Sequence, residues 1–170
     1  AVISNHDVKT IYEVPLVLEE AGLGRFIATR LGLNHTEPDL KEWQVMVNAL
    51  RKPLPKYEIA IVGKYVELPD SYLSVIESIR LAGIEQEVNP EIRWVNAEDL
   101  EDRDPHDLLE GVAGIIVPGG FGPRGIEGKI QAAHYARTNN VPYLGLCLGM
   151  QIAVIEFARN VRHTDRSTTI

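Results

Sequence analysis

The chain has 170 residues, a formal net charge of −7 and one cysteine. The acidic balance argues against general binding to nucleic acid or to anionic membranes, and a single cysteine excludes a disulfide within the chain. No apolar run approaches the length of a membrane span and no signal peptide is visible. The composition therefore predicts a globular protein with neither nucleic acid nor a membrane as partner.

The first 50 residues are predicted to be mainly helical. Pro15 can occupy the first turn of a helix, and Gly22 can end one. From Asp39 to Leu50 the apolar residues recur at helical spacing, which indicates an amphipathic helix. Residues 51–55 contain two prolines and are typical of a linker.

After the linker, short apolar segments alternate with helical patterns. Strands are predicted at Ile59–Val62, Ile92–Asn96, Gly114–Val117 and Val141–Leu146, and helices at Ser71–Ala82, Pro105–Gly111, Lys129–Thr138 and Gly149–Arg159. Gly83 is expected to close the first of these helices, and the acidic residues 98–104 to form a solvated connection. This alternation predicts an α/β fold with a doubly wound, mostly parallel sheet, preceded by a helical segment.

The cysteine lies in Gly145-Leu-Cys147-Leu-Gly149-Met150-Gln151, between a predicted strand and a predicted helix. This arrangement is the thiol counterpart of the Gly-x-Ser-x-Gly nucleophile elbow. Side chains at Gly145 and Gly149 are expected to clash with the facing strand and helix, and the helix N-terminus favours the reactive thiolate. A lone cysteine is more often a buried structural thiol, but the flanking glycines favour a nucleophile.

A second glycine-rich loop, Pro118-Gly-Gly-Phe-Gly-Pro-Arg-Gly125, follows the predicted strand Gly114–Val117. Parallel strands present their carboxyl ends to one crevice, so this loop and the cysteine turn are expected to face the same site. Backbone N–H groups of Gly119 or Gly120 and of Leu148 would then form an oxyanion hole for the attack of a thiolate on an amide. Taken alone, the loop is explained equally well as a flexible connection.

Two further patterns carry less weight. Val62-Gly-Lys-Tyr65 lacks the complete phosphate-loop motif. His134 is predicted to have a surface or packing role, and the five histidines are scattered without partners at zinc spacing. No metal site is therefore predicted in this segment.

The cysteine elbow and the glycine loop together resemble class I (triad) glutamine amidotransferases. Longer stretches closely resemble the CTP synthase family, and this resemblance extends from Ala1 to about Val161. The stretches that carry it are Ala1–Ser4, Asp7–Pro15, Glu58–Tyr65, Ser71–Glu77 and Pro118–Lys129.

The resemblance implies a ligase of pyrimidine biosynthesis that aminates UTP to CTP with ATP and Mg²⁺, using ammonia that a Cys-His-Glu glutaminase releases from glutamine. GTP is the implied allosteric activator, and a cytoplasmic homotetramer assembled through the synthetase domain is the implied assembly. Cys147 is the implied nucleophile, and Phe121 and Arg124 are expected to contact the effector. The implied oxyanion-hole donors are Gly120 and Leu148. The residues implied to bind glutamine are Gly119, Gly120, Leu148 and Gln151.

The same resemblance divides the chain into the end of a synthetase (amidoligase) domain over 1–50, a linker over 51–57, part of a glutamine amidotransferase domain over 58–161 and an unmatched tail over 162–170. The family's His-Pro-Glu segment, with its catalytic His and Glu, does not occur in these 170 residues. We therefore expect a fragment, or ordered pieces of a longer enzyme, that is inactive by itself and lacks the ATP site. The alternatives are another class I glutamine amidotransferase, a hydrolase with a cysteine elbow, or a non-catalytic module.

Overall fold

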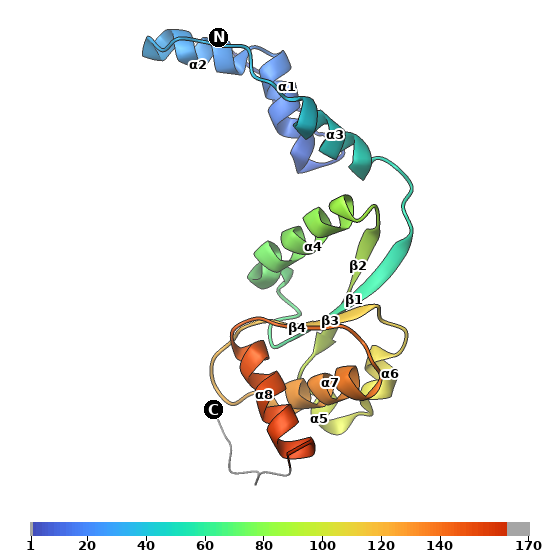
Figure 1. The fold of residues 1–170 in the computed structure, drawn as a ribbon. Helices are drawn as coiled ribbons and strands as arrows, with labels where there is room; N and C mark the ends of the chain where they lie inside the picture. The colour runs from blue at the N-terminus through green and yellow to red at the C-terminus, as the bar shows by residue number, and fades with distance from the viewer. Residues whose placement is uncertain (1, 163–170) are drawn as a thin grey trace. The chain divides into compact units, whose positions relative to one another are not determined.

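The computed structural model describes residues 2–162, so the predicted tail lies outside the described residues apart from Arg162. The chain divides after Pro53 into two compact units. The first unit is helical, and the second is an α/β unit that contains the cysteine turn and the glycine loop (Figure 1). No helix between residues 2 and 162 is long and apolar enough to cross a membrane.

The first unit is mainly helical, as predicted. It consists of the 3₁₀-helix η1 (Ile11–Glu13) and the α-helices α1 (Val14–Glu20), α2 (Leu23–Leu31) and α3 (Lys41–Leu50). Pro15 lies in the first turn of α1, as expected. Helix α3 begins two residues later than predicted, since the Asp39 carboxylate lies before the helix and accepts a hydrogen bond from the Lys41 N–H at 3.1 Å.

The second unit is built on a parallel sheet with the strand order β2-β1-β3-β4. The strands are β1 (Lys56–Gly63), β2 (Asn89–Asn96), β3 (Gly114–Val117) and β4 (Tyr143–Gly145). The helices are η2 (Pro69–Tyr72), α4 (Leu73–Glu85), α5 (Asp99–Asp102), α6 (Pro105–Leu109), α7 (Ile126–Thr138) and α8 (Leu148–Asn160). The predicted doubly wound parallel sheet is confirmed.

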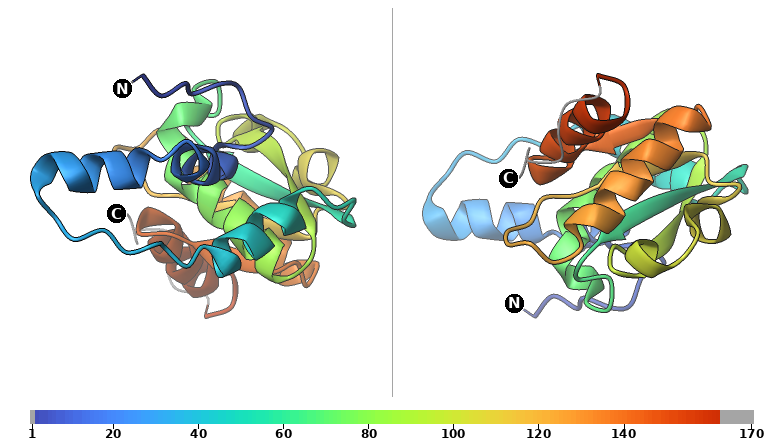
Figure 2. Two further views of the ribbon diagram at one scale, coloured as in Figure 1. Left: turned by 90° about the horizontal axis from the view of Figure 1, so that it is seen from above. Right: turned by 90° about the horizontal axis from the view of Figure 1, so that it is seen from below.

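Helices cover both faces of this sheet. Helix α4 lies on one face and α5 to α8 lie on the other (Figure 1), and the two views of Figure 2 show the same layers from above and from below. On the α5–α8 side, side chains that alternate along the strands form the main core with the helices. The strand residues of this core are Ala60, Val62, Val95, Ile115 and Val117.

The opposite face contains an apolar hollow of about 660 Å³ beside α4. Ile59 and Ile116 of the sheet line it together with Val75 and Ile79 of α4. Among the described residues, no charged side chain contributes to its lining. The polar side chains in its lining include those of Ser74, Ser78 and Tyr143.

Helix α4 does not end where the sequence suggested. It continues through Gly83 to Glu85, so the expectation that Gly83 closes the helix is wrong. A Cβ atom on Gly83 would lie 2.5 Å from Cδ of Pro90 on β2. The glycine is thus explained by the close approach of the helix to the strand, and not by a left-handed helix end.

Other boundaries also differ from the expectation. The acidic stretch is more than a solvated connection, because residues 99–102 form α5 and the Leu100 side chain is buried. Strand β1 begins at Lys56, inside the predicted linker, since Lys56 already pairs with Asn89 of β2. Strand β4 is shorter than predicted because its pairing partner β3 has only four residues.

Candidate active site

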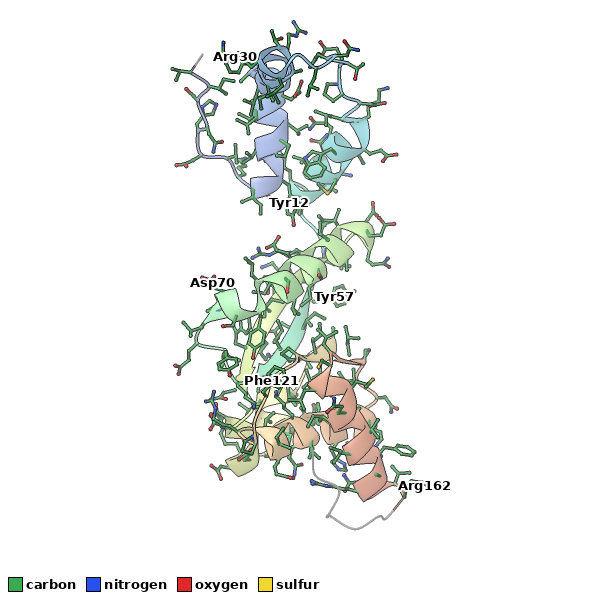
Figure 3. All side chains as sticks on the ribbon, turned by 90° about the vertical axis from the view of Figure 1, so that its left-hand side faces the viewer. Tyr12, Arg30, Tyr57, Asp70, Phe121 and Arg162 are labelled. Carbon is green, nitrogen blue, oxygen red and sulfur yellow. The ribbon has the colours of Figure 1, made fainter. Side chains whose placement is uncertain are left out.

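The carboxyl ends of β1, β3 and β4 lie at one edge of the sheet because the strands are parallel. Cys147 follows β4 and the glycine loop follows β3. Both contribute to a hollow of about 570 Å³, whose lining includes Gly120, Phe121, Cys147, Leu148 and Gln151. The structure thus brings the cysteine turn and the glycine loop to one crevice, with the Phe121 side chain (labelled in Figure 3) 94% exposed beside it.

The backbone of Cys147 is strained. Its φ of 53° and ψ of −102° place it outside the regions that a residue with a side chain ordinarily adopts, at a cost of about 1–3 kcal/mol. The Leu146 N–H donates to the Val117 carbonyl at 2.9 Å, and the Tyr143 hydroxyl donates to the Gly149 carbonyl at 2.7 Å. These bonds hold both sides of the turn, so the exposed thiol is presented at the start of α8.

The two glycines beside the cysteine permit this turn. A Cβ atom on Gly145 would overlap the backbone of Gly149, and a Cβ atom on Gly149 would overlap the carbonyl oxygen of Val117. The clash expected from the sequence is confirmed at both positions. The start of α8 can therefore pack directly against the ends of β3 and β4.

We expect Gly149→Ala to destabilise the second unit by about 3 kcal/mol, since a buried methyl group forces backbone shifts. Gly114→Ala is the matched control, because a Cβ atom there would lie no closer than 3.4 Å to any neighbour. The measurement is urea unfolding of both variants and of the unmodified protein. Equal transition midpoints for the two variants would show that the elbow tolerates a side chain.

Backbone N–H groups near the thiol are available as donors. Leu148 is the first residue of α8, so its N–H has no acceptor inside the helix. Among the described residues, the peptide groups of Gly119 and Gly120 take part in no backbone–backbone hydrogen bond. A Cβ atom on Gly119 would lie 3.6 Å from Cβ of Cys147, and one on Gly120 would lie 3.9 Å from Cδ2 of Leu148. The two glycines therefore lie directly against the cysteine turn.

Two buried lysines lie beneath the glycine loop. The Lys64 ammonium donates to the carbonyl oxygens of Phe121 at 2.6 Å and Gly122 at 2.9 Å. Lys129 is completely buried, and its Nζ has no hydrogen-bond partner among the described residues. Burial, followed by the positive charge of Arg124, lowers the pKa of Lys64. Burial, followed by the charge of Lys64, lowers the pKa of Lys129 to about 8.

Sequence reasoning did not identify these lysines as parts of the site. It considered Lys64 only as part of an incomplete phosphate loop, although Lys64 directly follows a buried strand end. For Lys129 the available signal was its spacing from Ile126, Ile130 and Ala133, which places a charged residue on an apolar helix face.

Arg124 and the two described histidines of the second unit, His106 and His134, are not among the residues that line the hollow. The Arg124 guanidinium pairs with Glu98 at 2.9 Å and lies over the Tyr65 ring, 5.6 Å from its centroid. His134 packs between α7 and α8, with Nδ1 2.9 Å from Oε1 of Glu156, which matches its predicted packing role. Within residues 2–162 no three His, Cys, Asp or Glu side chains are grouped to hold a metal ion.

Glu156 joins the two helices that carry the loop and the cysteine. Burial alone would raise the pKa of its carboxyl group, but hydrogen bonds from Arg137, His134 and Asn160 outweigh burial and lower it. The Arg137 guanidinium, on α7, binds both carboxylate oxygens of Glu156, on α8. This charged contact fixes α8 against α7, and with it the position of the elbow.

Residues 67–169 match the family model described as glutamine amidotransferase class-I. CTP synthase of Roseiflexus sp. (strain RS-1) is 58% identical over 161 residues, which are 95% of this chain and 29% of that protein. CTP synthase of Pyrococcus abyssi is 56% identical over 161 residues, which are 95% of this chain and 30% of that protein. The chain thus spans about three tenths of the length of these curated relatives.

One solved structure with a similar fold is described as Trypanosoma brucei CTPS, the glutaminase domain with bound acivicin. The alignment has a TM-score of 0.58 and 47% sequence identity, and it covers 62% of this chain and 41% of that chain.

Proposed function

The chain belongs to the class I glutamine amidotransferase family, and we propose from this that it carries the nucleophile and the oxyanion hole of the glutaminase reaction of a CTP synthase. The observation that supports this proposal best is the strained, glycine-flanked Cys147 facing the Gly119–Gly120 loop in one hollow. A non-glycine residue in such a conformation is typical of a functional position. The similarity to CTP synthases over 95% of the chain supports CTP formation as the reaction that uses the ammonia.

The proposed reaction begins when Sγ of Cys147 attacks the side-chain amide carbon of glutamine. A C–S bond forms and the electron pair of the carbonyl moves to oxygen, where the N–H groups of Gly120 and Leu148 donate to the developing charge. The tetrahedral intermediate then expels ammonia and leaves a glutamyl thioester. Water hydrolyses the thioester, which releases glutamate and restores the thiol.

Other residues of the hollow have supporting roles in this proposal. Gln151 lies one turn along α8 and lines the hollow, where its amide can bind the substrate glutamine together with Gly119 and Gly120. Phe121 and Arg124 belong to the glycine loop and are the proposed contacts of GTP. The proton transfers belong to a His oriented by a Glu, which the family resemblance places in a His-Pro-Glu segment that these 170 residues do not contain.

The rest of the proposed enzyme follows from the family. Residues 1–50 are the end of the synthetase domain, 51–57 the linker and 58–161 part of the amidotransferase domain. ATP and Mg²⁺ act in the synthetase domain, where the ammonia converts UTP to CTP, and that domain forms the cytoplasmic homotetramer. The division of the structure after Pro53 supports this arrangement.

The test uses the complete polypeptide that carries this sequence, supplied with UTP, ATP and Mg²⁺. We expect CTP to form with either glutamine or ammonium chloride, and one glutamate to appear for each CTP made from glutamine. Treatment with acivicin, which the Trypanosoma brucei relative binds, should stop only the glutamine-dependent reaction. Glutamate release without CTP formation from either nitrogen source would instead indicate a different amidotransferase. Thioester formation with other amides but not with glutamine would indicate a cysteine hydrolase.

A further inference from the structure

Lys129 is a buried charge that the proposed reaction leaves unexplained. Its side chain has no solvent exposure, and its Nζ has no hydrogen-bond partner among the described residues. An ammonium group without an acceptor in a protein interior is strongly unfavourable. The position of Lys129 in the first turn of α7, directly after the glycine loop, therefore calls for a partner that the ammonium can bind.

The side chain of Lys129 ends beneath Gly120. A Cβ atom built on Gly120 would lie 3.7 Å from Nζ of Lys129 and 3.7 Å from Cε of Lys64, whereas one on Gly119 would lie 3.6 Å from Cβ of Cys147. Gly119 thus faces the cysteine, whereas Gly120 faces the two lysines and Leu148. Lys64 already donates to the carbonyls that follow Gly120, so Lys129 is the cation available to the peptide between the glycines.

That peptide has two useful orientations. In a planar trans peptide the C=O of Gly119 and the N–H of Gly120 point in opposite directions, and a bond between two glycines turns with little steric resistance. When the Gly120 N–H points at the cysteine, the Gly119 carbonyl points at the lysines. The reverse orientation directs an N–H at two positive charges and withdraws the donor from the site.

We propose that Lys129 is a positioning residue, which binds the Gly119 carbonyl and thereby keeps the Gly120 N–H turned toward the oxyanion at Cys147. This role rests on the proposed glutaminase function. It explains why an unpaired lysine is buried beneath this loop: its acceptor is the carbonyl that becomes available in the competent orientation of the peptide.

The charge of Lys129 gives this role a pH dependence. Burial and the charge of Lys64 lower the pKa of Lys129 to about 8. The charged groups that face it are Lys64 at the end of β1 and, next to Lys64, the Arg124–Glu98 pair. Below this pKa the ammonium binds the carbonyl strongly, and above it the neutral amine binds weakly. The contribution of Lys129 to the rate is therefore present at lower pH and is lost as the pH rises through about 8.

The test compares Lys129→Met with Lys41→Met in the complete polypeptide, since Lys41 is an exposed lysine of the other unit. We expect Lys129→Met to lower kcat for glutamine hydrolysis by about 10- to 100-fold, which is less than the effect of removing an oxyanion donor completely. KM should stay within about twofold of the value for the unmodified protein. The rate at which iodoacetamide alkylates Cys147 should stay within about twofold of that of the unmodified protein, because this displacement forms no oxyanion. Lys129→Gln, which keeps a neutral donor, should give an intermediate kcat.

A pH series separates this role from a purely structural one. The ratio of kcat for the unmodified protein to kcat for Lys129→Met should fall as the pH rises through about 8, because every other titrating group is common to both. A pH-independent ratio, an unchanged kcat, or equal losses of hydrolysis and of alkylation would overturn the inference. If Lys129→Met does not fold, Lys129→Gln takes its place under the same criteria. An unmodified protein that releases no glutamate would contradict the proposed function itself.

Discussion

Replacing Cys147 with alanine is expected to abolish CTP formation from glutamine while CTP formation from added ammonia continues at the rate of the unmodified enzyme. Cys147 is the nucleophile of the proposed amide cleavage, and loss of a nucleophile lowers kcat by several orders of magnitude, at least about 1000-fold. Ammonia supplied directly does not need that step. The substitution removes one sulfur atom from an exposed residue, so the fold is expected to persist.

Parallel assays of CTP formation with glutamine and with ammonium chloride measure the two activities separately. Val154→Ala is a suitable control, since Val154 lies exposed on the same helix and outside the lining of the hollow. Loss of both activities in a variant that still folds would contradict the assignment of Cys147 to the glutaminase step alone. Retention of the glutamine-dependent activity would exclude Cys147 as the nucleophile.

Gly120→Pro is expected to lower the glutamine-dependent rate by about 100- to 1000-fold, the usual effect of removing one oxyanion donor. Proline lacks the N–H that the proposed mechanism directs at the oxyanion. The reaction with ammonia should change little, because it bypasses the tetrahedral intermediate of amide cleavage.

Gly120→Ala provides the matched control for this prediction. Its methyl group has room, since the nearest atoms would be 3.7 Å away, and alanine keeps the N–H. We expect Gly120→Ala to retain its rate within about threefold, and steady-state release of glutamate measures both variants. Similar rates for the proline and alanine variants would exclude the Gly120 N–H as a donor.

Local patterns in the sequence were enough to predict the architecture around the cysteine. The alternation of short apolar runs with helical patterns predicted the parallel sheet. Strands and helices have different hydrophobic periods, so the two kinds of segment can be distinguished where they alternate along the chain. Gly145 and Gly149 identified the elbow, since only a residue without a side chain fits where a helix begins against a strand end. The parallel order then implied that the loop after β3 and the turn after β4 share one edge of the sheet.

Helix ends and the groups beneath the site depended on contacts between distant residues. The position of Gly83 in the sequence predicts a helix end, but the close approach of Pro90 shows that the glycine allows α4 to pack against β2. Arg124 belongs to the glycine loop, but its guanidinium binds Glu98, 26 residues away. Neither partner can be recognised from local spacing.

The sequence by itself determined where the cysteine elbow lies and which turns accompany it, because those features depend on neighbouring residues and on the fixed geometry of a parallel strand. The tertiary structure alone decided what lies beneath the glycine loop. Lys64 and Lys129 are 65 residues apart in the chain, and they meet under Gly120 only because β1 pairs with β3 and α7 packs against both strands. The burial and mutual repulsion that lower the pKa of Lys129 arise from that packing, and no pattern of spacing along the chain encodes them.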